Sequence, residues 1–170
     1  TSSSFTIRGI GDLCTGFSCD RATGIHLNDM PLVENRLFET EYFDLERVEV
    51  LRGPQGTLYG RNATSGVVNF ITARPLLGEF AGNATVEFGN FSSNRLTGML
   101  NVPLTDWAAV RLAGYSLVRG GYTKNLFDGS SIDGRDVYAF RGTLRIRPSS
   151  STTLDLMGYV FSEDDDRSRI

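Results

Sequence analysis

The sequence predicts a β-barrel that spans a membrane, because three features of its 170 residues point to tilted antiparallel strands. Apolar and polar residues alternate from Phe80 onward, the alternating segments are joined by short connections and one long one, and glycine and aromatic residues are abundant. The chain has 19 glycines and 11% aromatic residues. This composition favours short strands and tight turns over a helical bundle.

Five segments show the alternation. In the first, the even positions from Phe80 to Phe88 are apolar or glycine, and the positions between them are mostly polar. A period of two is typical of a strand whose faces differ. Most segments approach the roughly 9–11 residues that a tilted strand needs to cross a bilayer. The five segments are 80–88, 95–104, 110–115, 138–147 and 154–161.

The connections support the same interpretation. Three of them are short, whereas the polar stretch 119–135 is long, and outer-membrane barrels have short turns at one end and longer loops at the other. Trp107 lies beside a short turn, as expected of an aromatic residue at a membrane interface. There is no run of roughly 18 apolar residues, so no membrane-spanning helix is expected.

A soluble antiparallel sandwich is the alternative, since its strands alternate too. The inward positions of the fourth segment include Arg141, Arg145 and Arg147. Three arginines on one strand suit a polar lumen better than a sandwich core. Five strands cannot close a barrel in lipid, where unpaired backbone groups cost several kcal/mol each. We therefore expect the sequence to be a fragment of a longer chain.

Other functional classes find little support. The 17 basic and 20 acidic residues give a net charge of −3, whereas nucleic-acid-binding proteins usually present a basic field. The glycine-rich stretch 53–66 has no Gly-Lys-Ser/Thr, and Pro54 removes a backbone donor that a phosphate would need. His26 is the only histidine and has no obvious partner. We expect the acidic run 163–166 to begin a solvated loop and not to hold a metal ion. We expect neither an enzyme nor a bound metal or cofactor.

Three motifs resemble those of one family. They are "FTIRGIG" at 5–11, "GIHLNDMPL" at 24–32, with Asn28 and Asp29 in a turn, and "LERVEVLRGPQGTLYGRNATSGVVNFITARP" at 45–75. In this order they are similar to the plug domain of TonB-dependent outer-membrane receptors. The later segments resemble the first strands of the family's barrel. The residues themselves indicate strands at 46–51 and 67–71, with tight turns at Gly53, Gly56 and Gly60.

The resemblance implies a mixed α/β plug inside a membrane β-barrel of about 22 strands. Residues 1–78 would be the C-terminal part of the plug, and 79–170 the first barrel strands. It also implies active uptake of a small ligand, with a ferric siderophore as the family's commonest choice, across the bacterial outer membrane through TonB. The TonB box would lie outside this sequence. Cobalamin, a glycan or an aromatic compound stays open as ligand, as does a surface β-domain without transport.

The resemblance also assigns roles to individual residues. Arg8 and Arg52, each followed by glycine, would pair with barrel glutamates and lock the plug. The outward apices of the plug would help bind ligand. Within those apices, Cys14 and Cys19 are five residues apart in a compartment that permits disulfides, so we expect them to be bonded. The candidate ligand-binding residues are Phe17, Arg21, Glu34, Asn35, Glu41 and Tyr42.

Overall fold

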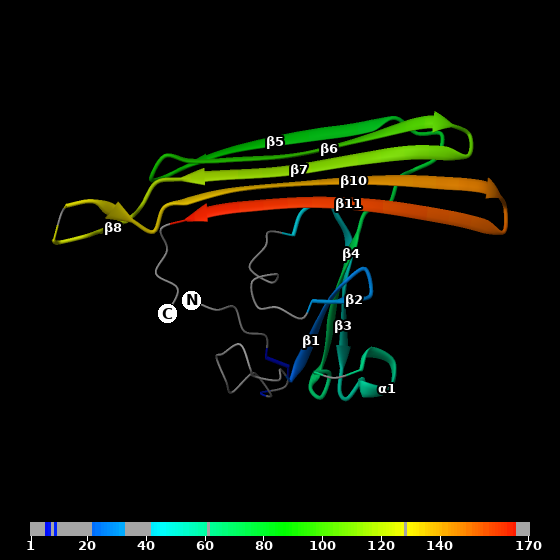
Figure 1. Ribbon diagram of the computed structural model, residues 1–170, viewed down its shortest axis with the longest axis horizontal. Helices are drawn as coiled ribbons and strands as arrows, with labels where there is room; N and C mark the ends of the chain where they lie inside the picture. Colours follow the sequence, from blue (N-terminus) through cyan, green and yellow to red (C-terminus); the bar gives the residue numbers. More distant parts are fainter. Residues whose placement is uncertain are drawn as a thin grey trace. The chain divides into compact units, whose positions relative to one another are not determined.

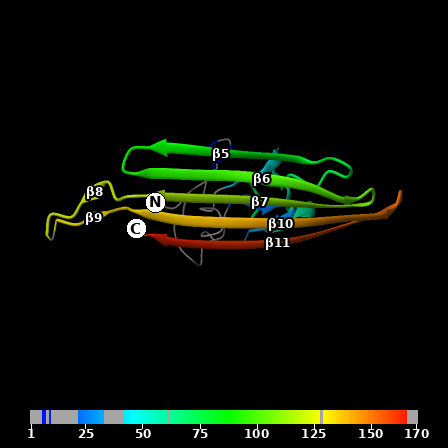
Figure 2. The same cartoon turned by 90° about the horizontal axis from the view of Figure 1, so that it is seen from above.

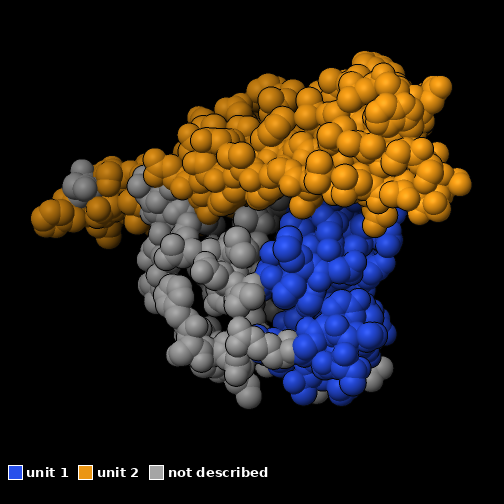
Figure 3. All heavy atoms as spheres, turned by 45° about the vertical axis from the view of Figure 1, so that its right-hand side comes forward, with its two compact units in different colours: residues 1–73, 169–170 blue, residues 74–168 orange. Residues whose placement is uncertain are grey.

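The computed structural model of the chain describes residues 6–7, 9, 22–32, 42–60, 62–127 and 129–165. The chain divides into two compact units, one of residues 1–73 with 169–170 and one of residues 74–168 (Figure 3). Where the plug would end and the barrel begin stays a prediction. No helix among the described residues is long and apolar enough to cross a membrane.

The first unit contains a four-stranded sheet in the order β2–β1–β4–β3 (Figure 1). In this sheet β1 is parallel to β4, and β3 is antiparallel to it. All seven residues of β4 are buried, as expected of a central strand. The elements are β1 (Thr23–Leu27), β2 (Met30–Pro31), β3 (Leu45–Arg52), α1 (Gly56–Tyr59) and β4 (Gly66–Thr72). The strands expected at 46–51 and 67–71 are confirmed.

The glycines of the first unit have different roles. Gly53 and Gly60 have positive φ angles of 90° and 75°, which confirms tight turns at both. Gly56 does not: it begins α1, a single turn that is too short to leave a helical periodicity in the sequence. Gly66 is required at the start of β4. Its φ is 148°, and a Cβ there would lie 2.2 Å from the carbonyl oxygen of Leu51.

The core of the first unit is small. Its buried centre consists of Ile25 on β1 with Val68 and Phe70 on β4. Partly buried apolar side chains surround this centre: Ile7, Leu27, Leu32, Tyr42 and Leu45. The parallel pairing of β1 with β4 therefore aligns the apolar side chains of two strands that are about 40 residues apart in the sequence.

The second unit is an antiparallel meander in the order β11–β10–β7–β6–β5 (Figures 1 and 2). Its strands are β5 (Ala81–Gly89), β6 (Ser93–Thr105), β7 (Ala108–Arg119), β10 (Arg135–Ser149) and β11 (Thr152–Asp165). All five expected strands are confirmed, and most run further than the alternation indicated. The long connection contains a small hairpin of β8 (Thr123–Lys124) and β9 (Ser131–Ile132).

The two ends of this meander differ. At one end, residues 106–107 join β6 to β7 and residues 150–151 join β10 to β11. At the other end, residues 90–92 join β5 to β6, and the hairpin-bearing segment 120–134 joins β7 to β10. Two-residue turns at one end and a longer connection at the other are the arrangement found in outer-membrane barrels.

The strand register gathers the alternating residues onto two continuous faces. One row across the sheet runs Gly82, Leu100, Leu112, Gly142 and Gly158, so even-numbered residues meet even-numbered residues on every strand. This is the predicted apolar face. Its exposed members include Val86, Phe88, Leu96, Leu100, Leu104, Tyr138, Phe140, Leu154, Leu156 and Val160.

One expectation for the second unit is wrong. The acidic run from Glu163 was expected to begin a solvated loop, but β11 continues to Asp165. Glu163 lies on the polar face of the sheet, where its Oε1 is 3.0 Å from Nε of Arg135. The sequence predicts a loop here because the alternating apolar residues end before the acidic run. The backbone pairing of β10 with β11 nevertheless continues beyond them.

Candidate functional site

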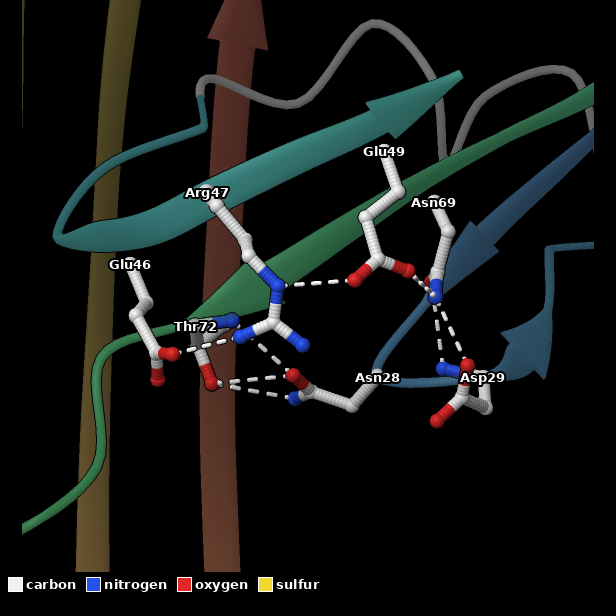
Figure 4. A network of polar contacts seen from close by, with 7 residues as sticks. All are labelled: Asn28, Asp29, Glu46, Arg47, Glu49, Asn69 and Thr72. Carbon is white, nitrogen blue, oxygen red and sulfur yellow. Dashed lines mark hydrogen bonds and ion pairs between the residues drawn. The ribbon is translucent and has the colours of Figure 1, made fainter. Parts of the chain in front are cut away.

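A network of polar side chains joins β3, β4 and the β1–β2 turn of the first unit around Asn69 (Figure 4). Asn69 lies on β4 and is fully buried. Its Oδ1 accepts a hydrogen bond from the backbone N–H of Asp29 at 3.1 Å, and its Nδ2 donates to Asp29 Oδ1 at 2.7 Å. The same Nδ2 lies 3.4 Å from Oε2 of Glu49 on β3. One amide thus connects the β1–β2 turn to β3 across the central strand.

The other residue of that turn is also held by β4. Asn28 Oδ1 accepts the backbone N–H of Thr72 at 2.9 Å, and Asn28 Nδ2 donates to Thr72 Oγ1 at 3.0 Å. Asn28 and Asp29 both have positive φ angles, 50° and 66°. Two such residues form the tight hairpin turn whose twist matches antiparallel strands. The side-chain contacts with β4 support this conformation, which is unfavourable for residues other than glycine.

Arg47 is the charged end of the network. Its Nε donates to Glu49 Oε1 at 2.7 Å, and its guanidinium also pairs with Glu46 (Figure 4). The hydrogen bond from Arg47 lowers the pKa of Glu49, and the same contact raises the pKa of Arg47. These side chains are largely in water, where ion pairs add little stability. The pair therefore orients Glu49 toward Asn69 more than it stabilises the unit.

His26 has partners that the sequence did not reveal. It is buried on β1, with Nδ1 3.3 Å from the backbone oxygen of Asp29 and its ring edge-on to Tyr59 at 4.9 Å between centroids. Tyr59 belongs to α1, so His26 packs between the turn and the helix. Among the described residues, no group of histidine, cysteine or carboxylate side chains could hold a metal ion.

Tyr42 is the one candidate ligand-binding residue within the described part of the chain. Its ring stacks on Phe70 with centroids 3.7 Å apart and planes inclined by 8°. Such stacking adds roughly 0.5–1.5 kcal/mol beyond the area that is buried. One face of the Tyr42 ring is therefore taken by the core, and a ligand would have only the other face.

Arg52 ends β3 and is exposed. Among the described residues, no carboxylate pairs with it, so its expected role in a lock stays a prediction. Several expected site residues lie outside the described residues: Arg8, Cys14, Phe17, Cys19, Arg21, Glu34, Asn35 and Glu41.

The second unit has polar residues on its buried face. Asn101, Arg111, Arg141 and Thr143 are all buried, whereas the opposite face exposes leucine, valine and phenylalanine. A soluble sandwich buries its apolar face and exposes its polar one. The arrangement here is the reverse, as in a barrel whose apolar side chains face lipid and whose polar side chains face the lumen. This settles the choice that the alternation alone left open.

Ion pairs reinforce the polar face. Arg145 on β10 makes a two-point contact with Asp155 on β11, with Nε–Oδ1 and Nη2–Oδ2 distances of 2.8 and 2.7 Å. Arg135 and Glu163 pair on the same two strands, nearer the long connection, with most of each side chain buried. Paired charges of this kind fix strand register as well as filling a polar interior.

Sequence reasoning missed the asparagines that hold these structures together. Asn69 and Asn101 are fully buried. A signal was present for Asn69, since it interrupts the apolar run "VVNFI", and a polar residue there needs buried hydrogen-bond partners. Asn101 left no such signal, because it falls on a polar position of its strand.

Residues 1–67 match the family described as TonB-dependent Receptor Plug Domain. Over 111 residues the chain is 35% identical to the metal-pseudopaline receptor CntO of Pseudomonas aeruginosa, a match that covers 65% of this chain and 14% of that protein. The chain spans only 9–14% of the length of the curated relatives that it matches.

Two solved receptor structures have a fold similar to that of this chain. The siderophore receptor PiuA from Acinetobacter baumannii matches with a TM-score of 0.72 and 16% identity, over 95% of this chain and 21% of that one. The ferric yersiniabactin uptake receptor FyuA from Yersinia pestis matches with a TM-score of 0.71 and 24% identity, over 81% of this chain and 22% of that one. At these identities the likeness concerns the fold alone.

Proposed function

We propose that this chain is part of a TonB-dependent receptor of the bacterial outer membrane, a transporter that imports a ferric siderophore with energy delivered through TonB. The observation that supports this most directly is the meander with an exposed apolar face and a buried charged face, preceded by a plug-type sheet. The relatives contribute the ligand class, since one is a metal-pseudopaline receptor and others are catecholate siderophore receptors.

The proposed mechanism follows from the width of the barrel and from the need to move the plug that closes it. A barrel of about 22 strands is too wide for its own side chains to fill, so a plug must close it. Ligand would bind on the outward apices of the plug, where we place Phe17, Arg21, Glu34, Asn35, Glu41 and Tyr42. TonB would then draw on the plug from the periplasm and open a path. A disulfide between Cys14 and Cys19 would keep the first apex rigid.

The uptake experiment compares binding with transport. Cells that produce the intact receptor, with or without TonB, are given a panel of iron-radiolabelled siderophores. We expect one of them to bind to both strains and to accumulate only where TonB and the proton-motive force are present. Accumulation that is unchanged without TonB would contradict active transport. Radiolabelled cobalamin and a radiolabelled glycan are tested in the same way, and accumulation of either one instead would replace the siderophore as the ligand and leave the mechanism in place. Binding without any accumulation would favour a surface β-domain.

We further propose that Arg8 and Arg52 lock the plug through barrel glutamates. The exposure of Arg52 at the end of β3, directly before the positive φ of Gly53, supports this role, because its guanidinium is free to reach a distant carboxylate. The Arg8→Ala/Arg52→Ala variant should admit a large glycopeptide antibiotic, and the Arg8→Lys/Arg52→Lys variant should admit less. Equal exclusion by the parent and the alanine variant would show that both arginines are ordinary surface residues.

A further inference from the structure

The segment 74–79 connects the last strand of the plug sheet to β5, and it has no strand partner of its own. Side chains of the second unit replace that partner. Asn101 on β6 accepts the backbone N–H of Leu76 with Oδ1 at 3.0 Å. Its Nδ2 donates to the backbone oxygens of Leu76 at 2.9 Å and Glu79 at 2.6 Å. Both donor hydrogens and one lone pair of the amide are therefore used on this segment.

A second side chain holds the preceding residue. Nη1 of Arg145 lies 3.4 Å from the backbone oxygen of Pro75, and Pro75 is fully buried. Arg145 is itself fixed by its two-point contact with Asp155. Three backbone oxygens and one N–H of the segment are thus held by β6 and β10, with β11 supporting β10.

The position of this contact matters for strand pairing. Asn101 is also the register partner of Ala81, the first residue of β5. A pull on the segment would therefore act at the first pair between β5 and β6, where backbone hydrogen bonds would open one after another. Contacts at residues 75, 76 and 79 lie ahead of that pair. These contacts would transfer the force to β6 and β10 before the force reaches the first residue pair of β5.

We propose that Asn101 and Arg145 are positioning residues that anchor the plug–barrel linker to the inner wall, so that force on the plug does not peel β5 from β6. The inference rests on the proposed transport by a pulled plug. Asn101 lies four residues from the end of β6 at the two-residue turns. The anchor therefore lies near the end of the meander that we assign to the periplasm, the side from which TonB would act.

The variant Asn101→Leu removes all three hydrogen bonds and keeps the branching of the side chain at Cγ. Asn83→Leu is the matched control, because Asn83 lies on the same polar face of the neighbouring strand β5 and is exposed. Hydrogen exchange of the intact purified receptor is measured over residues 74–80. We expect exchange to be at least about tenfold faster in Asn101→Leu and unchanged in Asn83→Leu, since buried hydrogen bonds are costly to lose.

The second measurement tests the mechanical role. Entry of a large glycopeptide antibiotic is followed in cells with and without TonB. We expect Asn101→Leu to raise entry only in TonB-containing cells that are transporting ligand, while surface binding of ligand stays at the level of the parent. Should Asn101→Leu fail to assemble, Asn101→Asp keeps the acceptor for Leu76 and loses both donors. It should then show the same TonB-dependent entry, because a carboxylate oxygen cannot donate to the backbone oxygens of Leu76 and Glu79.

The outcomes separate this inference from the proposed function. Faster exchange in Asn101→Leu with no TonB-dependent entry would overturn the anchor, because the contact would then be structural only. Unchanged hydrogen exchange over residues 74–80 in Asn101→Leu would also overturn the anchor, because the hydrogen bonds of Asn101 would then not hold the segment. Loss of TonB-dependent uptake in the parent itself would instead contradict the proposed function.

Discussion

An arginine at Leu100 should destabilise the receptor in a lipid bilayer, and the loss should depend on depth. Leu100 is the central residue of the apolar stretch from Leu96 to Leu104 on β6. Leu104, four residues on, is about 13 Å away along the strand at ~3.3 Å per residue. With a strand tilt of roughly 40°, this is about 10 Å in depth, close to half of the roughly 25 Å apolar band.

The magnitudes follow from these depths. An arginine near the midplane costs about 2–4 kcal/mol, and one near the interface about 0–1 kcal/mol. We therefore expect Leu100→Arg to lower the free energy of unfolding by about 2–4 kcal/mol and Leu104→Arg by about 0–1 kcal/mol. Asn83→Arg is the control, since Asn83 is exposed on the opposite, lumen-facing side of the sheet. It should cost less than about 0.5 kcal/mol.

The assay is denaturant unfolding of the intact receptor in lipid vesicles, with the parent and the three variants measured side by side. We expect the largest loss of unfolding free energy for Leu100→Arg, a smaller loss for Leu104→Arg and the smallest for Asn83→Arg. Equal losses for Leu100→Arg and Asn83→Arg would refute the assignment of the faces. Equal losses for Leu100→Arg and Leu104→Arg would agree with a lipid-facing position for both residues but would refute the difference in depth assigned to them.

Three further predictions concern the plug. Asn69→Leu should destabilise the plug by about 1–3 kcal/mol, because the backbone N–H of the turn loses a buried acceptor; hydrogen exchange of the β1–β2 turn would measure this, and unchanged exchange would show that the contact is dispensable. Arg47 lowers the pKa of Glu49 below its ordinary 4.5, so their contact stabilises β3 above pH 4.5 and is lost as the pH falls below it. The protection of β3 amides, after correction for the pH dependence of intrinsic exchange, should therefore fall on acidification in the parent and not in Glu49→Gln. Cys14 and Cys19 should give an unreduced peptide lighter than the dithiol by two hydrogens, and quantitative thiol labelling without reductant would contradict the disulfide.

The sequence was sufficient to predict the barrel strands because their two faces differ. Leu96, Leu100 and Leu104 are visible as period two without any knowledge of their neighbours. The strand ends were less predictable. Asp136 and Asp164 continue the outward face of β10 and β11 as register partners. A polar residue on that face breaks the alternation, yet the backbone ladder continues beyond the apolar band.

The contacts of the plug sheet were harder to predict for a different reason. Asn69 and Asp29 are 40 residues apart, and Asn28 and Thr72 are 44 apart. No local periodicity carries information about such pairs, which exist only once the parallel pairing of β1 with β4 is formed. The helix α1 was missed because four residues cannot display a helical face.

Asparagine is the residue that these junctions share, and its chemistry explains the choice. Asn28, Asn69 and Asn101 each accept a hydrogen bond from a backbone N–H with the side-chain oxygen and donate one to an oxygen atom with the side-chain nitrogen. A carboxylate only accepts hydrogen bonds and a guanidinium only donates them, whereas one amide does both. An amide also does not titrate, so its hydrogen bonds to backbone groups keep their strength where charged pairs weaken with acid or salt. If a plug must be pulled repeatedly in a compartment whose pH and ionic strength follow the surroundings, its fixed points are best made from neutral groups. Asn101 makes three of the four side-chain hydrogen bonds described for the linker, and Arg145, held by Asp155, makes the fourth at Pro75.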